Sequence, residues 1–349
     1  MGRAGGKAMA MAAAAVGIAS ALASAGPADP PGPRPAPRVS VVMAPDGRGG
    51  TVGGRARVLA GTVLSARVRG QVDGRATWAL AYGDDVLAHG AVRLDAAGCG
   101  LVRIAAPDVH TRTVCRLLVR SEGGDDAVDV EVFPALLLAS VAQRLAGIRV
   151  AVADPTGNVA AALRAEGLAV EPMETDIEKR VFDGDVAVLA GYHRPDALEA
   201  MCRALDGRLR RGMTLVALNP PPAWQAWGFG LRNLPESRVG RPVPATVFRQ
   251  ILQPGDIGTG HWTAALQVPD DAVPLVWLET EDAPPSPVPP GQAADALVAA
   301  GRVGRGRLIV GVLPELADPQ ADAVGRCVLG EMLLWSVRES DAGRSGPDR

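Results

Sequence analysis

The chain has 349 residues, enough for one large domain or two ordinary domains with substantial cores. Its 36 basic residues nearly balance its 38 acidic ones, so nothing electrostatic favours nucleic acid or an anionic membrane surface as a partner. The four cysteines form no Cys-x-x-Cys motif, which removes the usual zinc and thioredoxin-like signatures.

Residues 1–25 have the three parts of a cleavable signal peptide. Arg3 and Lys7 give a basic start, Ala8 to Leu22 is uncharged and weakly apolar, and Ala23-Ser24-Ala25 is a small-residue cleavage site. The alternative, an uncleaved membrane anchor, is disfavoured because the stretch is short and mostly alanine. We therefore expect a secreted or periplasmic protein that has no membrane contact after cleavage. Residues 26–37 are a proline-rich linker that favours an extended polyproline conformation.

Residues 38–134 are predicted to form an immunoglobulin-like β-sandwich. Short runs of β-branched and aromatic residues alternate with glycine-rich turns, as is typical of a small all-β domain. The expected strands are Val39–Met43, Val58–Leu64, Thr77–Tyr82, Leu101–Ile104, Val114–Val119 and Val128–Phe133. Because both lie in this β region, Cys99 and Cys115 are the best candidates for a disulfide in an exported protein. The alternative is four separate thiols at Cys99, Cys115, Cys202 and Cys327.

Residues 135–146 form a helical connector, and residues 147–338 are predicted to be an α/β domain. Ile148–Ala153 is a short apolar run typical of a strand buried on both faces. Asp154 or Thr156 is then placed to cap a helix over Val159–Glu166 that ends at Gly167. A strand at Leu168–Val170 completes the first half of a parallel α/β unit.

The rest of the α/β domain alternates in the same way. We expect a helix over Arg194–Arg211, a closing helix over Asp318–Val337, and strands at Asp185–Ala190, Met213–Leu218, Leu275–Leu278, Leu297–Val303 and Leu308–Val312. Residues 220–269 are rich in proline and predicted to be irregular. The glycines of 301–306 precede a strand instead of a helix, so they predict a hairpin turn and not a dinucleotide site. Residues 339–349 are predicted to be a disordered tail.

Candidate ligand-binding residues follow the strands of this sheet, because open α/β sheets bind ligands at the carboxyl ends of their strands. They are Asp154, Tyr192, His193, Asn219 and Glu315. The chain lacks a nucleophile elbow there, because three prolines follow Asn219 and remove the amide donors of an oxyanion hole. One histidine per region is too few for a metal site. We expect no catalytic residue, no metal and no cofactor.

Three tryptophans extend this candidate site. Trp224, Trp227 and Trp262 lie in the proline-rich 220–269 stretch. Exposed aromatic rings on loops stack on the apolar face of sugars. The competing interpretation is that the three rings anchor a long loop to the domain.

Two stretches carry a family resemblance. Trp78 to Leu80 with the ending Val130-Glu131-Val132-Phe133-Pro134 resembles the immunoglobulin-like modules of glycoside hydrolase family 2 proteins. Val303 to Val310, followed by Leu313, Asp318 and a closing helix, resembles the C-terminal region of the same β-galactosidase-like proteins. The resemblance implies a non-catalytic module similar to class I glutamine amidotransferases, with a flavodoxin-like fold. The family's catalytic barrel needs about 250 residues and does not fit in the roughly 190 residues that follow the sandwich.

The sequence thus predicts an exported, non-catalytic accessory protein of carbohydrate metabolism. Its expected partner is a carbohydrate or a secreted glycoside hydrolase, and its oligomeric state is left open. One alternative is a hydrolase or amidotransferase-like enzyme with a site around Asp154, His193 and Glu315. The other is a structural module that binds another protein.

Overall fold

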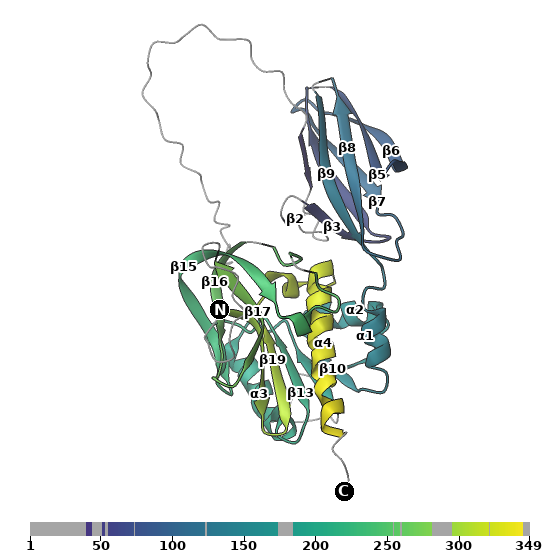
Figure 1. The fold of residues 1–349 in the computed structure, drawn as a ribbon. Helices are drawn as coiled ribbons and strands as arrows, with labels where there is room; N and C mark the ends of the chain where they lie inside the picture. The colour runs from purple at the N-terminus through teal and green to yellow at the C-terminus, as the bar shows by residue number, and fades with distance from the viewer. Residues whose placement is uncertain are drawn as a thin grey trace, which may run out of the picture. The chain divides into compact units, whose positions relative to one another are not determined.

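The computed structural model describes residues 40–43, 51–52, 55–72, 74–122, 124–173, 184–253, 255–258, 260–280, 295–320 and 322–344 (Figure 1). The predicted signal peptide and proline-rich linker lie outside these residues. Residues 37–349 form one compact unit. Within the described part, no helix is long and apolar enough to cross a membrane.

The first half of this unit is built from β-strands, as predicted. One sheet has the strand order β1-β4-β7 and the other β2-β3-β9-β8-β5-β6. The strands are β1 Ser40–Met43, β2 Thr51–Val52, β3 Arg55–Leu59, β4 Val63–Arg69, β5 Arg75–Tyr82, β6 Asp85–Arg93, β7 Cys99–Ala105, β8 Thr113–Ser121 and β9 Gly124–Phe133. Apolar side chains from both sheets form one buried cluster. The alternation of buried and exposed residues along β8, for example, reflects the two faces of a strand.

Two details of this half differ from the sequence prediction. The stretch Val58–Leu64 is divided into β3 and β4 by a turn at Gly61, whose φ of 73° suits glycine. The edge strand β6 was not predicted, because its mixture of glycine, histidine and charged ends hides the alternation. Cys99 and Cys115 lie on strands of different sheets, and all four cysteines are free thiols.

The second half contains five parallel strands in the order β11-β10-β12-β13-β19. The strands are β10 Val150–Ala153, β11 Val170–Pro172, β12 Val186–Leu189, β13 Thr214–Leu218 and β19 Gly306–Gly311, and the helices are α1 Ala139–Arg144, α2 Asn158–Ala165, α3 Pro195–Leu209 and α4 Ala323–Arg344. Successive residues of β10 face opposite sides: Val150 and Val152 pack with α1, α2 and α4, whereas Ala153 packs with α3. The sheet is therefore covered on both faces, which explains its uninterrupted apolar strands.

The prediction of an irregular 220–269 stretch is wrong. It contains the 3-10 turn η1 Thr246–Phe248 and three antiparallel strands, β14 Gln225–Ala226, β15 Phe229–Pro244 and β16 Gly260–Gln267. These join two further antiparallel strands that were predicted, β17 Val273–Thr280 and β18 Ala296–Val303, and the 3-10 turn η2 Pro314–Ala317 follows β19. The prolines of β15 hid the strand pattern. The β15–β16 register shifts between Asn233 and Arg238, around Pro235, and at Pro242 β15 pairs only with β17. Proline is tolerated at such bulges and strand edges.

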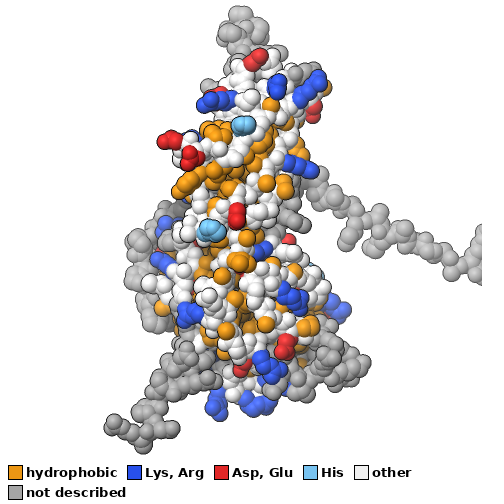
Figure 2. Space-filling model, turned by 90° about the vertical axis from the view of Figure 1, so that its right-hand side faces the viewer, with side chains coloured by type: hydrophobic (Ala, Val, Ile, Leu, Met, Phe, Trp, Pro, Cys, Tyr) orange, Lys and Arg blue, Asp and Glu red, His pale blue; other side chains and the backbone are white. Residues whose placement is uncertain are grey.

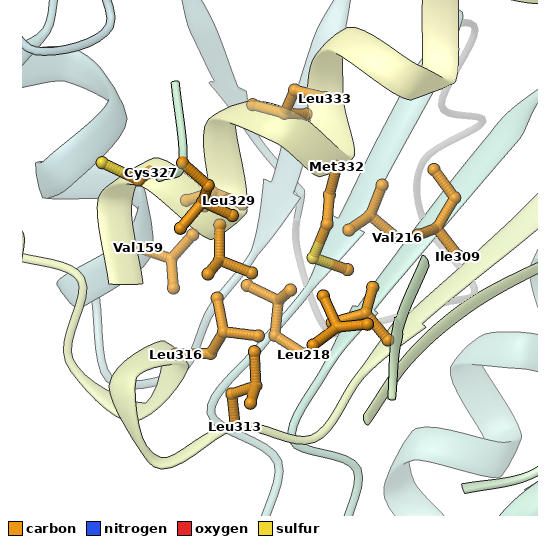
Figure 3. Packing of buried hydrophobic residues seen from close by; sticks show 14 of the residues in the cluster. Val159, Val216, Leu218, Ile309, Leu313, Leu316, Cys327, Leu329, Met332 and Leu333 are labelled. Atoms are coloured by element: carbon orange, nitrogen blue, oxygen red, sulfur yellow. The ribbon is translucent and has the colours of Figure 1, made fainter. Parts of the chain in front are cut away.

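Helix α4 forms the centre of the second core. Met332 points from α4 towards Val216 and Leu218 of β13 and Ile309 of β19, whereas Cys327 points away from these strands (Figure 3). Leu329 of α4 and Leu316 of η2 belong to the same buried cluster. All of these side chains are buried. The helix also extends to Arg344, into the stretch predicted to be a disordered tail.

Some apolar side chains are left on the outside of the sandwich. Figure 2 shows them gathered over the side that carries β5 and β6. They include Tyr82, Val86 and Leu87, each about half exposed.

Candidate functional site

Asp154 lies after β10, as predicted, but its carboxylate caps a helix. Its Oδ2 accepts hydrogen bonds from the backbone N–H groups of Val159 (2.7 Å) and Ala160 (3.3 Å) in the first turn of α2. Its Oδ1 accepts from Thr156 N (3.0 Å) and Thr156 Oγ1 (2.6 Å). All four bonds orient the loop before α2, and a carboxylate at a helix N-terminus is favoured by the helix dipole.

The neighbouring strand end brings Tyr192 near Asp154. A Cβ on Gly191 would lie 2.9 Å from Asp154 Oδ1, which shows how closely the two loops approach. Tyr192 is 9% exposed, and its hydroxyl has no hydrogen-bond partner among the described residues. Burial, and then the proximity of Cys202 and Asp154, raises the pKa of Tyr192 to about 12. His193 is exposed and points to no partner among the described residues.

Asn219 and Glu315 do not join that pair. Asn219 Nδ2 donates to Leu313 O and its Oδ1 accepts from Leu313 N, both at 2.9 Å, so the amide connects the ends of β13 and β19. Glu315 lies in η2, its buried Oε2 has no hydrogen-bond partner in the described part of the chain, and burial raises the pKa of its carboxyl. Because β12 and β13 separate β10 from β19, the loops that carry Asp154 and Glu315 are roughly 14 Å apart.

Of the two interpretations of the tryptophans, burial favours anchoring over sugar stacking for Trp224 and Trp262. Trp224 is fully buried and Trp262 is 7% exposed, with its indole N–H donating to Gly240 O at 3.3 Å. Both rings pack in the core of the second half, Trp262 from β16 and Trp224 from the turn directly before β14. Of the three, only Trp227 is partly exposed, at the start of the β14–β15 turn, where its φ is 50°.

Trp227 forms one wall of a pocket of about 220 Å³ between α3 and β14. The indole N–H of Trp227 donates to Asp206 Oδ1 at 2.7 Å, which fixes the ring against the helix. The other lining residues are Glu199, Cys202, Arg203 and Asp206 of α3, and Gln225 and Ala226 of β14.

Two titratable groups of this pocket, Asp206 and Cys202, have shifted pKa values. Hydrogen bonds from Arg210 and then from Trp227 lower the pKa of Asp206, so it is a carboxylate at neutral pH. Glu199 and Arg203 form an i,i+4 ion pair of 3.8 Å on the same helix face. Burial raises the pKa of Cys202 to about 12, although the indole N–H of Trp224 faces the sulfur. The thiol is thus neutral, which is the opposite of an activated nucleophile.

The sequence contained a signal for this pocket that was not used. Within the predicted helix Arg194–Arg211, Glu199, Cys202, Arg203 and Asp206 recur at helical spacing and form one stripe. The strand character of Gln225–Ala226, which completes the pocket, was hidden by the preceding prolines. In the described part of the chain, no group of three His, Cys, Asp or Glu side chains is arranged to hold a metal ion.

No protein-family model and no curated protein matches the sequence. Among solved structures, a β-galactosidase from Bacillus circulans sp. alkalophilus is 11% identical over 56% of this chain and 31% of its own, with a TM-score of 0.33. The exo-β-1,4-mannosidase Op5Man5 from Opitutaceae bacterium strain TAV5 is 14% identical over 57% and 38%, with a TM-score of 0.34. A cytoplasmic protein from Salmonella typhimurium LT2 is 11% identical over 64% and 96%, with a TM-score of 0.31. The chain thus has weak structural similarity to two glycoside hydrolases and spans less than two fifths of either.

Proposed function

We propose that this protein binds a carbohydrate and that the pocket beside Trp227 receives a single sugar residue of it. The observation that carries the proposal is the fixed indole of Trp227 standing over polar side chains of α3. Sugars are bound by an aromatic ring that receives their C–H face and by charged or amide groups that receive their hydroxyls. The pocket supplies Trp227 for the first role, and Asp206, Glu199, Arg203 and Gln225 for the second.

The size of the pocket suits a single small ring. Its volume of about 220 Å³ is below the roughly 300–1,000 Å³ of pockets that enclose drug-sized ligands. The pocket therefore has room for a terminal or exposed sugar residue, while the remainder of a longer glycan stays in solvent.

The proposed role is binding without catalysis. Asp154 is occupied by the first turn of α2, and Asn219 by Leu313. Cys202 is held as a neutral thiol by burial. These contacts support a binding module over the alternative of a hydrolase or amidotransferase-like enzyme around Asp154, His193 and Glu315, because Glu315 follows β19, which β13 separates from the neighbouring strands β10 and β12.

The fold families of the two halves are part of the same proposal. The parallel strands follow the order 2-1-3-4-5 when numbered along the chain, which is the order of flavodoxin-like folds, and this supports a flavodoxin-like second domain. We propose that this domain follows an immunoglobulin-like sandwich in an exported accessory protein of carbohydrate metabolism. A secreted glycoside hydrolase remains the proposed protein partner.

The test is glycan binding by Trp227→Ala. Screening the wild-type protein on a glycan array and measuring the best ligand by calorimetry should give a binding constant. Trp227→Ala should then weaken binding by about 1–3 kcal/mol, the usual loss for a stacked aromatic contact. The fold should survive, because Trp227 is partly exposed and lies at a turn. Trp227→Phe, which keeps a ring but loses the bond to Asp206, should fall between the two.

Trp224→Ala is the matched control three residues away. Trp224 is fully buried, so its truncation should lower the free energy of unfolding by about 3–5 kcal/mol. Thermal melts separate this loss of stability from a loss of binding. The proposal fails if no glycan binds the wild-type protein, or if Trp227→Ala binds the glycan as tightly as wild type does.

A further inference from the structure

A second pocket lies at the other end of α3, where the parallel strands begin. Its volume is about 320 Å³. It is lined by Gly184 and Asp185 before β12, by Arg208 at the end of α3, and by Arg211, Gly212 and Met213 before β13. Neither the predicted strand-end site nor the Trp227 pocket shares a residue with it.

Arg208 and Arg211 differ from the other arginines of this helix. Arg194 pairs with Asp196, Arg203 with Glu199, and Arg210 with Asp206. Among the described residues, no carboxylate lies within ion-pair distance of Arg208 or Arg211, and neither guanidinium donates a hydrogen bond. The guanidinium groups of Arg208 and Arg211, three residues apart, thus line the same pocket.

The charge of the pocket favours an anion. Among the described residues that line it, the only carboxylate is Asp185, whose Oδ2 already accepts a hydrogen bond from the backbone N–H of Arg149 at 2.9 Å. Two guanidinium groups against one carboxylate leave a net positive charge. The hairpin turn between β18 and β19 lies beside the end of α3, because the backbone N–H of Arg305 donates to Arg210 O at 3.0 Å. Figure 2 shows basic side chains gathered at this lower end of the molecule.

The end of a helix explains part of this charge but not all of it. Cations are favoured near the carbonyl groups of a helix C-terminus. Those carbonyls are already bonded, however: Arg208 O accepts from Arg211 N and Met213 N, and Leu209 O accepts from Gly212 N. The guanidinium groups are therefore left to face the pocket with their donors unused.

We propose that this pocket binds an oxyanion group, a phosphate, sulfate or carboxylate carried by a small polar molecule, through bidentate contacts from Arg208 and Arg211. Guanidinium forks match the spacing of two oxygens in each of these groups. The proposal is independent of sugar binding at Trp227. If a molecule carries both a sugar and an acidic group, the pocket at Arg208 and Arg211 binds only its acidic group.

The test is titration of the full chain with sodium sulfate, sodium phosphate and sodium glucuronate, followed by calorimetry or by two-dimensional NMR of the Arg208 and Arg211 side chains. We expect saturable binding of at least one of the three, with the preferred anion identifying the source of the oxyanion. Arg208→Gln and Arg211→Gln should each weaken binding about tenfold. Arg208→Lys, which keeps the charge and loses the fork, should weaken it less. Added sodium chloride should weaken binding as well, since the pocket is open to solvent.

Arg194→Gln is the matched control, an exposed arginine at the opposite end of α3 that is paired with Asp196. It should leave anion binding unchanged. Circular dichroism melts confirm that each variant is folded, which is expected because none of these side chains is buried. Absence of saturable binding for all three anions would overturn the proposal, as would equal binding by wild type and the Arg208→Gln, Arg211→Gln double variant.

Discussion

A carboxylate at the carboxyl end of a parallel strand commonly either binds a ligand or caps the next helix. For Asp154, the sequence alone does not distinguish these two roles. Its position after β10 is that of a ligand-binding residue, and its position before α2 is that of a cap. Both roles require a short acidic side chain at this point. The structure distinguishes them, because four hydrogen bonds to Thr156, Val159 and Ala160 use both oxygens.

Replacing Asp154 should therefore affect stability. Asp154→Ala removes the acceptors for the first turn of α2 and should lower the free energy of unfolding by about 1–2 kcal/mol, as measured by urea denaturation. Asp154→Asn keeps one side-chain oxygen and should lose less. Sugar binding at Trp227 should be unchanged in both variants. A ligand whose affinity falls in Asp154→Asn, while stability does not, would contradict the capping role.

The candidate site shows the same limit at single residues. Trp224, Trp227 and Trp262 look alike in the sequence, since all three lie among prolines and glycines. Their burial is decided by strands β14 to β16, which place Trp224 and Trp262 inside and leave Trp227 at a turn. Such long-range pairing overrides local sequence pattern. The stripe of residues from Glu199 to Asp206 on α3 could be predicted from the sequence, whereas strand β14 on the opposite side of the pocket could not.

At the scale of elements, buried parallel strands were the most predictable part of the chain. β10, β12, β13 and β19 are short runs of β-branched and small apolar residues, and each was expected within a few residues of its observed bounds. The hairpin at 303–306 was also expected, and Gly304 in that turn has a φ of 61°. Strand β15 was not predicted, because its pairing partner changes from β16 to β17 along its length. Its prolines are compatible with this change, but no sequence pattern indicates it.

The junction between η2 and α4 has an electrostatic consequence. Glu315 of η2 is near Asp322, which accepts hydrogen bonds from Val324 N (2.8 Å) and Gly325 N (3.0 Å) at the start of α4. Burial raises the pKa of both carboxyl groups, and each also lies near the positive charge of Arg57. The folded protein thus binds a proton at Glu315 more tightly than the unfolded chain does. For such a group, stability falls as pH rises from the unfolded pKa, about 4.3, to the raised folded value, and is constant above it.

Glu315→Gln should remove the loss of stability that the ionisation of Glu315 causes as the pH rises. The variant should melt about 2 °C or more above wild type at pH 7, and the difference should shrink at pH 4, where wild-type Glu315 is mostly protonated in both states. Glu171→Gln, at an exposed position on β11, should show no such gain. Melting curves between pH 4 and pH 8 measure both variants. A gain that is as large at pH 4 as at pH 7 would indicate a packing effect instead of a titration.

At the scale of the whole molecule, the two halves share buried groups. Leu59 of β3 and Phe133 of β9 belong to the same core cluster as α1 and α4. Arg57 of β3 donates to the backbone oxygens of Asp256 and, at 3.3 Å, of Gly255. The sequence indicated a boundary near residues 135–146 and two cores that fold separately. That autonomy remains a prediction, and the shared groups argue that it costs stability, because separating the halves exposes charges that are paired in the intact chain.

The centre of this shared region is an ion cluster. Glu131, 3% exposed, accepts from Arg57 Nε at 3.3 Å and from Arg112 Nε at 2.6 Å. Asp256, 1% exposed, accepts from Arg112 and, at 2.7 Å, from Gln253 N. Burial alone would lower the pKa of Arg112, but the hydrogen bonds to Glu131 and Asp256 outweigh it and raise that pKa. The guanidinium also lies 4.9 Å from the centre of the Phe133 ring.

Asp256→Ala should accordingly destabilise both halves together. Removing one partner of a buried ion pair leaves the other charge without compensation, and we expect a loss of about 3–5 kcal/mol in the free energy of unfolding. A double-mutant cycle with Arg112→Ala should give a coupling energy well above that of the exposed Arg120–Asp125 pair, which should be below about 1 kcal/mol. Hydrogen exchange of Asp256→Ala should show faster global opening in the sandwich strands and in α4 alike. If only residues 147–338 exchange faster, the halves are energetically independent and the ion cluster does not couple them.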